Sequence, residues 1–362
     1  MKIAAIITVH VGHNFGSNLQ TIATSEVLKN LGYSPLVVNY IPSRVSRKSY
    51  WQEAFKNPIK LCWRILHAPL FYKNLKIYEN YQSKYCKLTQ PIYDNDDFSQ
   101  KCPQTDVYIT GSDQVWNSKH NQGFNNRYFW DGVTDKAKKI AYASSFGVEM
   151  LPENEYALVS RYLKGYHAIS VREYSAKAIV ESMGLKAEHL LDPTFMLDKE
   201  QWKSFMSPKL IQEPYLLVYV PYNVVDRVGL YQKAKDIAKR KSLKVVTFSW
   251  DYKKEFLADI TIRFANPGDF LSLMYHADYV ITNSFHGTAF SINFNKQFCV
   301  YMPSGFGTRI TSILSLCNLE HRLINNNSES HIVNEYIDYD SVNDILAKER
   351  ETAYQFLEEA LA

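Results

Sequence analysis

The sequence predicts an α/β protein made of two doubly wound, Rossmann-like domains with a cleft between them. Short runs that are apolar throughout alternate with amphipathic stretches, as in parallel sheets covered by helices on both faces. The alternation restarts at residue 214, after a turn-rich passage over 190–202. The 362 residues suffice for two domains of ordinary size. We therefore place a first domain at 1–195, a second at 196–335 and a C-terminal helix at 336–362.

The first domain begins with a predicted strand over 3–9 and a helix over 17–32, whose apolar positions share one face and whose stop signal is Gly32. Helices are also expected at 153–164 and 173–183. The further apolar runs that predict strands of this domain are 34–40, 106–110, 138–146, 167–172 and 188–192.

The second domain repeats the arrangement, with helical stretches between its strands. The final stretch predicts a surface helix with Ser341 as its N-cap and Asp344 three residues further on. The apolar runs that predict strands here are 214–220, 243–249, 277–283 and 297–302.

Residues 44–87 interrupt the alternation as a helical insertion that is rich in aromatic and basic residues. One interpretation is a surface for an anionic partner, such as a lipid-phosphate-linked glycan, with peripheral membrane contact. The other is a solvated basic face, which we favour because most charge runs are only solvated. The charged residues are Arg44, Arg47, Lys48, Lys56, Lys60, Arg64, Lys73, Lys76, Lys84 and Lys87 against Glu53 and Glu79.

Composition narrows the class of protein. Charged residues make up 22% of the chain and the net charge of +4 is mild, so neither disorder nor nucleic-acid binding is expected. Five cysteines without CxxC spacing favour reduced thiols. The apolar start of the chain is short for a signal peptide, and no run approaches the roughly 20 apolar residues of a membrane span. We expect a cytoplasmic protein, with the inner membrane face as the place of any peripheral contact.

Polar residues gather where predicted strands end, which is where open α/β folds bind ligands. The loop after the first strand offers Asn14, Gly16 and Asn18 just before a helix, whose free amides suit an anion. His10 and His13 stand nearby without acidic or thiol companions, so we expect no metal site.

A second polar loop, at 110–117, follows another predicted strand. A tight turn with a helix cap explains part of it, but not so many hydrogen-bonding side chains beside a tryptophan. We take Ser144, at the end of the 138–146 run, as a further contact. The candidates in the loop itself are Gly111, Ser112, Asp113 and Gln114.

Three further candidates also follow apolar runs. Arg172 presents a fork that suits phosphate or carboxylate, but for this residue alone a surface pair with a glutamate is the favoured explanation. Ser284 is placed to cap a helix whose first turn holds His286, and a lone histidine is more often structural. Arg309 stands at a helix start, where a cation opposes the helix dipole, which favours an anion nearby.

Together these stretches resemble the polysaccharide pyruvyl transferase family, in the family's order and over nearly the whole chain. The least determined part is 44–87. The stretches that carry the resemblance are the opening "KIAAIITVHVGHNFGSNLQTIATSEVLKNLGYSPLVVNY", then "DVYITGSDQVWN", "KKIAYASSFG", "ISVREYSA", "LLDPTF", "YVITNSFHGTAFSINFNKQF" and "GTRITSIL".

The resemblance implies a fold like that of GT-B glycosyltransferases and a metal-free reaction without a cofactor. Phosphoenolpyruvate would donate its pyruvyl group as a ketal to a sugar of a capsule, exopolysaccharide or lipid-linked precursor, and phosphate would be released. Arg172, His286 and Arg309 fall on family positions for donor binding and catalysis. Many members have an arginine where this chain has Ser284, so donor contacts differ there.

The chemistry fits these residue types. Two arginines and a helix N-terminus suit the carboxylate and phosphate of the donor. His286 is the expected proton donor, and Asp113 is the candidate base for the sugar hydroxyl. Two other functions stay open: a nucleotide-sugar glycosyltransferase of the same fold, and a non-catalytic glycan-binding subunit.

Overall fold

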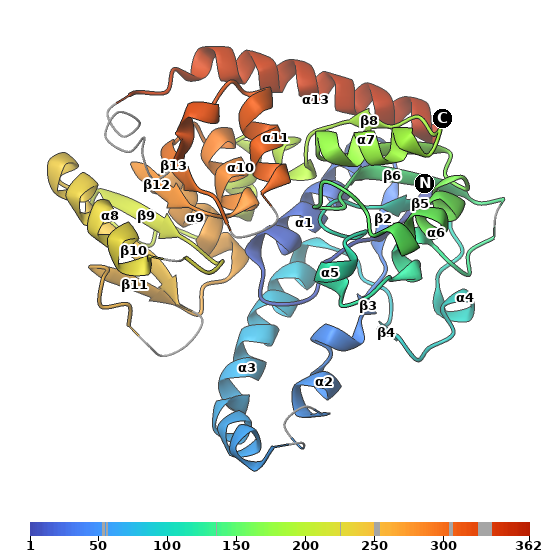
Figure 1. Cartoon of the computed structure of the whole chain (residues 1–362), viewed down its shortest axis with the longest axis horizontal. Coiled ribbons are helices and arrows are strands. Elements are labelled where there is room, and N and C mark those ends of the chain that lie inside the picture. Colours follow the sequence, from blue (N-terminus) through green and yellow to red (C-terminus); the bar gives the residue numbers. More distant parts are fainter. Residues whose placement is uncertain are drawn as a thin grey trace. The chain divides into compact units, whose positions relative to one another are not determined.

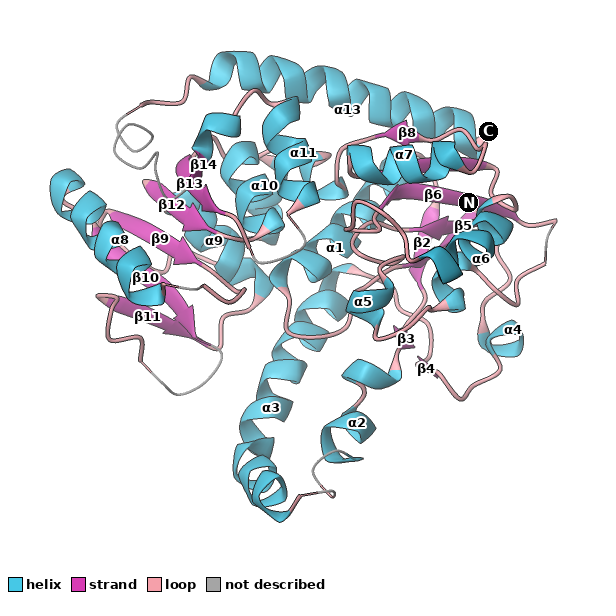
Figure 2. Ribbon diagram, in the orientation of Figure 1, coloured by secondary structure: helices cyan, strands magenta, loops and turns pink. Residues whose placement is uncertain are grey.

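The computed structural model describes residues 1–52, 55, 57–134, 136–224, 226–249, 254–303, 307–324 and 335–362. Glu53 and Lys56 of the predicted basic insertion, residues 304–306 and residues 325–334 lie outside this description. The chain divides into two compact units, Met1–Met196 with Thr352–Ala362, and Leu197–Glu351. Both units are α/β (Figures 1 and 2), as the sequence predicts.

Unit 1, which comprises Met1–Met196 and Thr352–Ala362, is built on a six-stranded sheet in which each described pair of neighbours is parallel. All four residues of β5 are buried, as expected for a strand covered on both faces. In sheet order the strands are β2 (Ser34–Val37), β1 (Ile3–Ile7), β5 (Val107–Thr110), β6 (Lys138–Ser144), β7 (Ala168–Val171) and β8 (Glu188–His189).

Most helices of unit 1 connect these strands, and two of them, α2 and α3, form the insertion predicted at 44–87. A two-stranded parallel sheet, β3 (Tyr40–Ile41) with β4 (Ile92–Tyr93), lies at the base of the insertion and was not predicted. Helix α1 begins at Phe15, two residues earlier than predicted. The helices are α1 (Phe15–Asn30), α2 (Arg47–Gln52), α3 (Pro58–Tyr85), α4 (Phe98–Lys101), α5 (Ser118–Asn121), α6 (Glu153–Leu163) and α7 (Tyr174–Ser182), with short 3-10 turns at Ser43–Val45, Asn126–Phe129 and Pro193–Phe195.

The predicted helical insertion forms an arm, α2 with α3, that extends away from the sheet of unit 1 (Figure 1). The Tyr50 and Phe71 rings stack with centroids 4.0 Å apart, and Trp51 donates to the hydroxyl of Tyr72. The buried residues of α3 begin at Leu70, so the preceding turns project beyond the packed part of unit 1.

Unit 2, Leu197–Glu351, has a second six-stranded parallel sheet. Its order is β11 (Ile260–Arg263), β10 (Lys244–Ser249), β9 (Tyr215–Tyr219), β12 (Tyr279–Thr282), β13 (Gln297–Tyr301) and β14 (Leu323–Ile324). Its helices are α8 (Arg227–Lys241), α9 (Pro267–His276), α10 (Phe285–Asn293) and α11 (Thr308–Leu316), with 3-10 turns at Gln201–Phe205 and Glu320–Arg322.

The C-terminal helix, α13, runs from Tyr339 to Leu361. It therefore begins two residues before Ser341, so the predicted N-cap is wrong and Ser341 lies within the first turn. Unit 2 contains the helix up to Glu351, and unit 1 contains it from Thr352.

The structure also describes the cysteines and the hydropathy of the helices. All five cysteines are free thiols, of which only Cys62 is exposed. Across the described ranges, no helix is both long enough and apolar enough to cross a membrane.

Candidate functional site

The strand order fixes where each unit offers a ligand site. Along the sheet of unit 1, successive strands run one way from β1 to β2 and the other way from β1 to β5. Along the sheet of unit 2, the same reversal falls between β9 and β12. Open parallel sheets bind ligands outside the carboxyl ends of the strands that flank such a switch point. Candidates follow three of these four strands, β1, β5 and β12, whereas Ser144, Arg172 and Arg309 lie at or after the ends of β6, β7 and β13.

The loop after β1 delivers three of them to the first turn of α1. Asn14 is the N-cap, and its side chain accepts from the backbone amide of Ser17 at 3.2 Å. Asn18 is buried in the same turn, and Gly16 lies there too. The first turn itself contains no acidic residue, and a carboxylate near its positive end is favourable.

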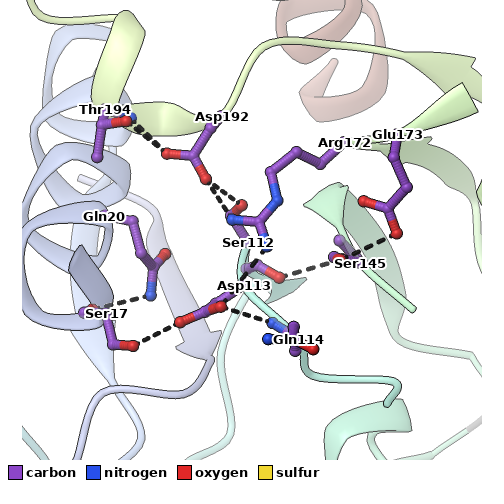
Figure 3. Close-up of polar contacts among 12 residues, drawn as sticks. Ser17, Gln20, Ser112, Asp113, Gln114, Ser145, Arg172, Glu173, Asp192 and Thr194 are labelled. Carbon is purple, nitrogen blue, oxygen red and sulfur yellow. Dashed lines mark hydrogen bonds and ion pairs between the residues drawn. The ribbon is translucent and has the colours of Figure 1, made fainter. Parts of the chain in front are cut away.

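Asp113, in the loop after β5, is held by groups from three segments (Figure 3). Ser17 donates its hydroxyl to the carboxylate at 2.5 Å, and the backbone amide of Gln114 donates at 2.8 Å. The guanidinium of Arg172 lies 3.5 Å away. Asp113 adopts a φ of +75°, a backbone conformation that is costly for a residue with a side chain and is frequent at functional sites.

Arg172 is a buried cation between carboxylates. One guanidinium nitrogen lies 2.6 Å from the carboxylate of Asp192, and the Arg172 side chain is 1% exposed. Burial by itself lowers the pKa of Arg172. The carboxylates of Asp192, Asp113 and Glu173 outweigh this effect, so the pKa of Arg172 is raised overall. The group therefore stays charged, and the surface ion pair considered from the sequence is wrong.

Asp192 completes this cluster and was missed as a site residue. Besides Arg172 it accepts from the hydroxyl of Ser112 at 2.8 Å and from both the amide and hydroxyl of Thr194 (Figure 3). The sequence showed Asp192 only as part of a turn. Its place at the end of a strand-like run, 188–192, was the signal that could have identified it.

The remaining candidates of unit 1 shape the loops around Asp113. Ser144 donates to the carbonyls of Thr110 and Gly111 at 3.0 and 3.1 Å, so its hydroxyl ties two strands together. A Cβ at Gly111 would lie 3.0 Å from that of Thr8, which explains why glycine suits this close approach. The side-chain oxygen of Gln114 accepts from Asn117 at 2.8 Å.

Unit 2 presents the stretch with His286 at its own switch point. The Asn283 side chain connects the two flanking loops, because it accepts from the amide of Tyr222 and donates to its carbonyl at 3.0 Å. Ser284 is the N-cap of α10, as predicted, and accepts from the amide of Gly287. His286 lies in the first turn and is 4% exposed.

Arg309 lies beside this turn. It occupies the start of α11, is 2% exposed, and holds its guanidinium 5.6 Å from the centre of the Phe285 ring. The same ring meets the His286 imidazole edge to face at 5.1 Å. Arg309 and His286 thus share one aromatic neighbour at the beginnings of two helices. Asp113 and Arg172 belong to unit 1, and His286 and Arg309 to unit 2.

His10 and His13, which follow the first strand, are not part of a metal cluster within the described residues. Burial lowers the pKa of His10 and of His13. The imidazole of His10 contacts the Thr8 carbonyl at 3.1 Å and the Asn39 side chain at 3.3 Å. Among the described residues, no three His, Cys, Asp or Glu side chains are grouped to hold a metal ion.

Comparisons with known proteins give a family and a fold. Residues 14–305 match the family model described as Polysaccharide pyruvyl transferase. This range includes the candidates from Asn14 to His286 and ends before Arg309. No curated protein matches the chain.

Two solved structures illustrate the fold. One is a UDP-N-acetylglucosamine 2-epimerase, with 7% identity, a TM-score of 0.55 and coverage of 99% of this chain and 90% of that one. The other is MnaA of S. aureus in a co-structure with UDP, with 12% identity, a TM-score of 0.50 and coverage of 99% and 91%. At such identities the likeness shows the fold alone, which is the GT-B fold.

Proposed function

This chain belongs to the polysaccharide pyruvyl transferase family, and we propose that it transfers the pyruvyl group of phosphoenolpyruvate to a sugar as a ketal, with release of phosphate. The acceptor would be a sugar of a cell-surface polysaccharide or of its lipid-linked precursor. The observation that carries the proposal is the family match over 14–305, which includes a histidine in the first turn of a capped helix.

The donor suits the helix starts of unit 2. Phosphoenolpyruvate carries a carboxylate and a phosphate on a three-carbon frame. The first turn of α10 supplies backbone amides, and Arg309 supplies a guanidinium at the start of α11. Helix N-termini and arginine forks both bind such oxyanions.

The proposed reaction proceeds in two steps. A sugar hydroxyl bonds to the central carbon of the donor while a proton reaches the methylene carbon, which becomes a methyl group. A second hydroxyl of the sugar then bonds to the same carbon as the carbon–phosphate oxygen bond breaks, which yields the ketal and phosphate. His286 would deliver the proton or assist the leaving phosphate.

Asp113 is the proposed base that removes the first hydroxyl proton. Its contacts with Ser17, the amide of Gln114 and Arg172 orient the carboxylate. Because Arg172 contacts two carboxylates, the structure favours a positioning role for it, whereas the sequence suggested donor binding.

The test is to incubate the protein with phosphoenolpyruvate and a panel of galactosides and mannosides, and to follow phosphate release and product mass. We expect a product carrying a pyruvate ketal. In His286→Gln, turnover should fall roughly 10²- to 10⁴-fold while phosphoenolpyruvate still binds. His276→Gln, on α9, is the matched control and should keep wild-type turnover. Binding of a nucleotide sugar but not of phosphoenolpyruvate would instead support a glycosyltransferase.

Exposed side chains on the arm support the interpretation of 44–87 as a membrane-contacting surface. Large apolar side chains are exposed at its far end, most of them on the helix that also carries the exposed Lys60 and Lys73. Apolar side chains interleaved with basic ones are typical of segments that bind the surface of anionic membranes. We propose that the arm contacts an anionic bilayer peripherally. The exposed side chains are Phe55, Ile59, Trp63, Ile65 and Leu66.

Sedimentation with phosphatidylglycerol vesicles tests this contact. The double variant Ile59→Ser/Leu66→Ser should bind at least about tenfold more weakly, since burial of each side chain contributes ~1.5 kcal/mol or more. Leu210→Ser/Val228→Ser removes two exposed apolar side chains of unit 2 and should bind like the wild type. Equal binding by both double variants would contradict the proposal.

A further inference from the structure

Unit 1 contains a cavity of about 740 Å³ whose lining includes residues of the arm. The loop after β1 lines it with His10 and Asn18, and the segment after β2 with Asn39. Helix α3 adds Tyr78 and Gln82. Binding sites for small molecules commonly have 300 to 1,000 Å³, so the space suits one or two sugar rings.

Apart from the exposed Lys48, the charged side chains that line the cavity are paired with protein groups. Arg47 donates to both carboxylate oxygens of Glu79 at 3.0 Å. Asp94 accepts from the hydroxyl of Tyr40 and the amide of Ser43, and Asp96 pairs with Lys101 at 2.7 Å. Since each lining carboxylate has a partner, the cavity favours a neutral ligand over a donor with several negative charges.

Two buried amides in the lining have unused hydrogen-bonding capacity. The side-chain oxygen of Asn18 and the side-chain nitrogen of Gln82 are buried, and neither has a hydrogen-bond partner within the described residues. The two residues are 1% and 4% exposed. Buried polar groups are nearly always paired in native proteins, so such exceptions point to a ligand.

The pair consists of one acceptor and one donor. A hydroxyl group both donates and accepts, so sugar hydroxyls complement the two amides better than an anion or an apolar ligand would. His10 belongs to the same lining, and burial lowers the pKa of its imidazole.

The wall formed by Tyr78 is rigid and apolar. Its ring is 3% exposed and stacks on Phe15 with centroids 5.5 Å apart and an angle of 24° between the planes. An aromatic and aliphatic wall suits the C–H face of a pyranose, while the amides suit its hydroxyls.

The cavity is also linked to the proposed base. Asn18 follows Ser17 in the first turn of α1, and Ser17 donates its hydroxyl to Asp113 at 2.5 Å. A sugar that contacts Asn18 would therefore lie next to the turn that orients the carboxylate of Asp113.

We propose that this cavity binds a neutral glycosyl unit, the acceptor sugar, with Asn18 and Gln82 as hydrogen-bonding residues and Tyr78 as its apolar wall. The assignment of that sugar as the acceptor rests on the proposed function. The arm would then contribute to acceptor selection, because Tyr78 and Gln82 both belong to α3.

The test measures glycoside binding without phosphoenolpyruvate, by saturation-transfer NMR with methyl β-galactopyranoside and methyl α-mannopyranoside. The wild type should bind at least one of them. Gln82→Leu and Asn18→Ala should each weaken that binding fivefold or more, and Gln100→Leu, an exposed glutamine on α4, should leave it unchanged. Because the nitrogen of Gln82 forms no hydrogen bond within the described residues, Gln82→Leu should not lower the midpoint of thermal unfolding.

Phosphoenolpyruvate binding, measured separately by calorimetry, distinguishes the two proposals. Glycoside binding that depends on Gln82, with no phosphate release from phosphoenolpyruvate, would keep the sugar cavity and remove the transferase. A wild type that binds neither glycoside, or variants that bind them as the wild type does, would overturn the cavity as a sugar site.

Discussion

At the scale of single residues, the cluster around Arg172 shows how unit 1 holds a charge away from water. The guanidinium contacts Asp192 and Asp113, while Ser112 and Thr194 complete the hydrogen bonds of Asp192. Breaking a buried pair costs more than the pair contributes, because the partner that stays behind keeps an uncompensated charge. The cluster therefore fixes the loops after β5, β7 and β8 with respect to one another.

Asp192→Asn should lower the free energy of unfolding by about 3 kcal/mol, because it leaves Arg172 buried without its nearest carboxylate. Urea denaturation measures the change. Glu181→Gln is the matched control, since it breaks the exposed Lys177–Glu181 pair and should cost less than about 0.5 kcal/mol. Similar losses of unfolding free energy in the two variants would mean that the buried cluster stabilises the fold no more than an exposed ion pair does.

His189 links this cluster to pH. Its imidazole contacts the Arg172 carbonyl at 3.1 Å and stacks on Tyr174. Burial lowers the pKa of His189 to about 4. The folded state thus prefers the neutral ring, and its contribution to stability is present above pH 6.5 and is lost as the pH falls toward 4.

His189→Gln should therefore flatten the loss of stability on acidification. The difference in the free energy of unfolding between pH 7 and pH 5 should shrink by about 1.5 kcal/mol, since each pH unit is worth up to roughly 1.4 kcal/mol. Chemical denaturation at both pH values measures it. An unchanged difference would show that His189 is not the group responsible.

At the scale of elements, α10 depends on a close approach to its own sheet. Ser284 caps the helix, and Thr282 donates its hydroxyl to the Tyr219 carbonyl beneath it. A Cβ at Gly287 would lie 2.2 Å from the Thr282 hydroxyl oxygen. Only glycine therefore lets the first turn of α10 pack this closely against the end of β12. That position is what buries His286 at the end of β12.

Gly287→Ala should destabilise unit 2 by about 1 to 3 kcal/mol, the usual cost of overpacking, and should lower turnover because His286 moves with the turn. Gly165→Ala is the matched control, because a Cβ there would meet only a carbonyl at 3.4 Å. Thermal unfolding and phosphate release would be measured on both. Wild-type behaviour of Gly287→Ala would contradict the close approach.

At the scale of the whole molecule, the C-terminal segment belongs to the first unit. Residues 352–362 of α13 are assigned to unit 1, and Tyr33 donates its hydroxyl to the Leu361 carbonyl at 2.9 Å. Ala353 and Leu357 are fully buried. Unit 1 is therefore completed only when the last turns of the chain have been added.

Leu357→Ala should destabilise unit 1 by about 2 to 5 kcal/mol through the cavity that it leaves. Glu358→Ala, one residue further on the exposed side of α13, should change stability by less than about 0.5 kcal/mol. Hydrogen exchange of β1 and β5 amides reports on unit 1 directly. Equal protection in the two variants would show that the C-terminal turns do not stabilise this sheet.

Local patterns along the sequence specify the kind of fold and most of its elements. Runs such as 106–110 and 277–283 are apolar throughout, and such local patterns specify buried parallel strands without reference to partners. The cap at Ser284 and the polar loop that holds Asp113 are local signals too, and both lie at strand ends as expected. The start of α13 was misplaced, because Ser341 suits a first turn as well as a cap.

Which of these residues meet depends instead on how the strands are ordered in the folded chain. Asp192 reaches Arg172 because β7 pairs with β8, and Ser17 reaches Asp113 because β1 pairs with β5. The cavity beside Asn18 likewise requires the arm to pack against the loop after β1. Composition and periodicity describe neighbours along the chain, whereas strand order brings together residues that are about 20 to 100 positions apart.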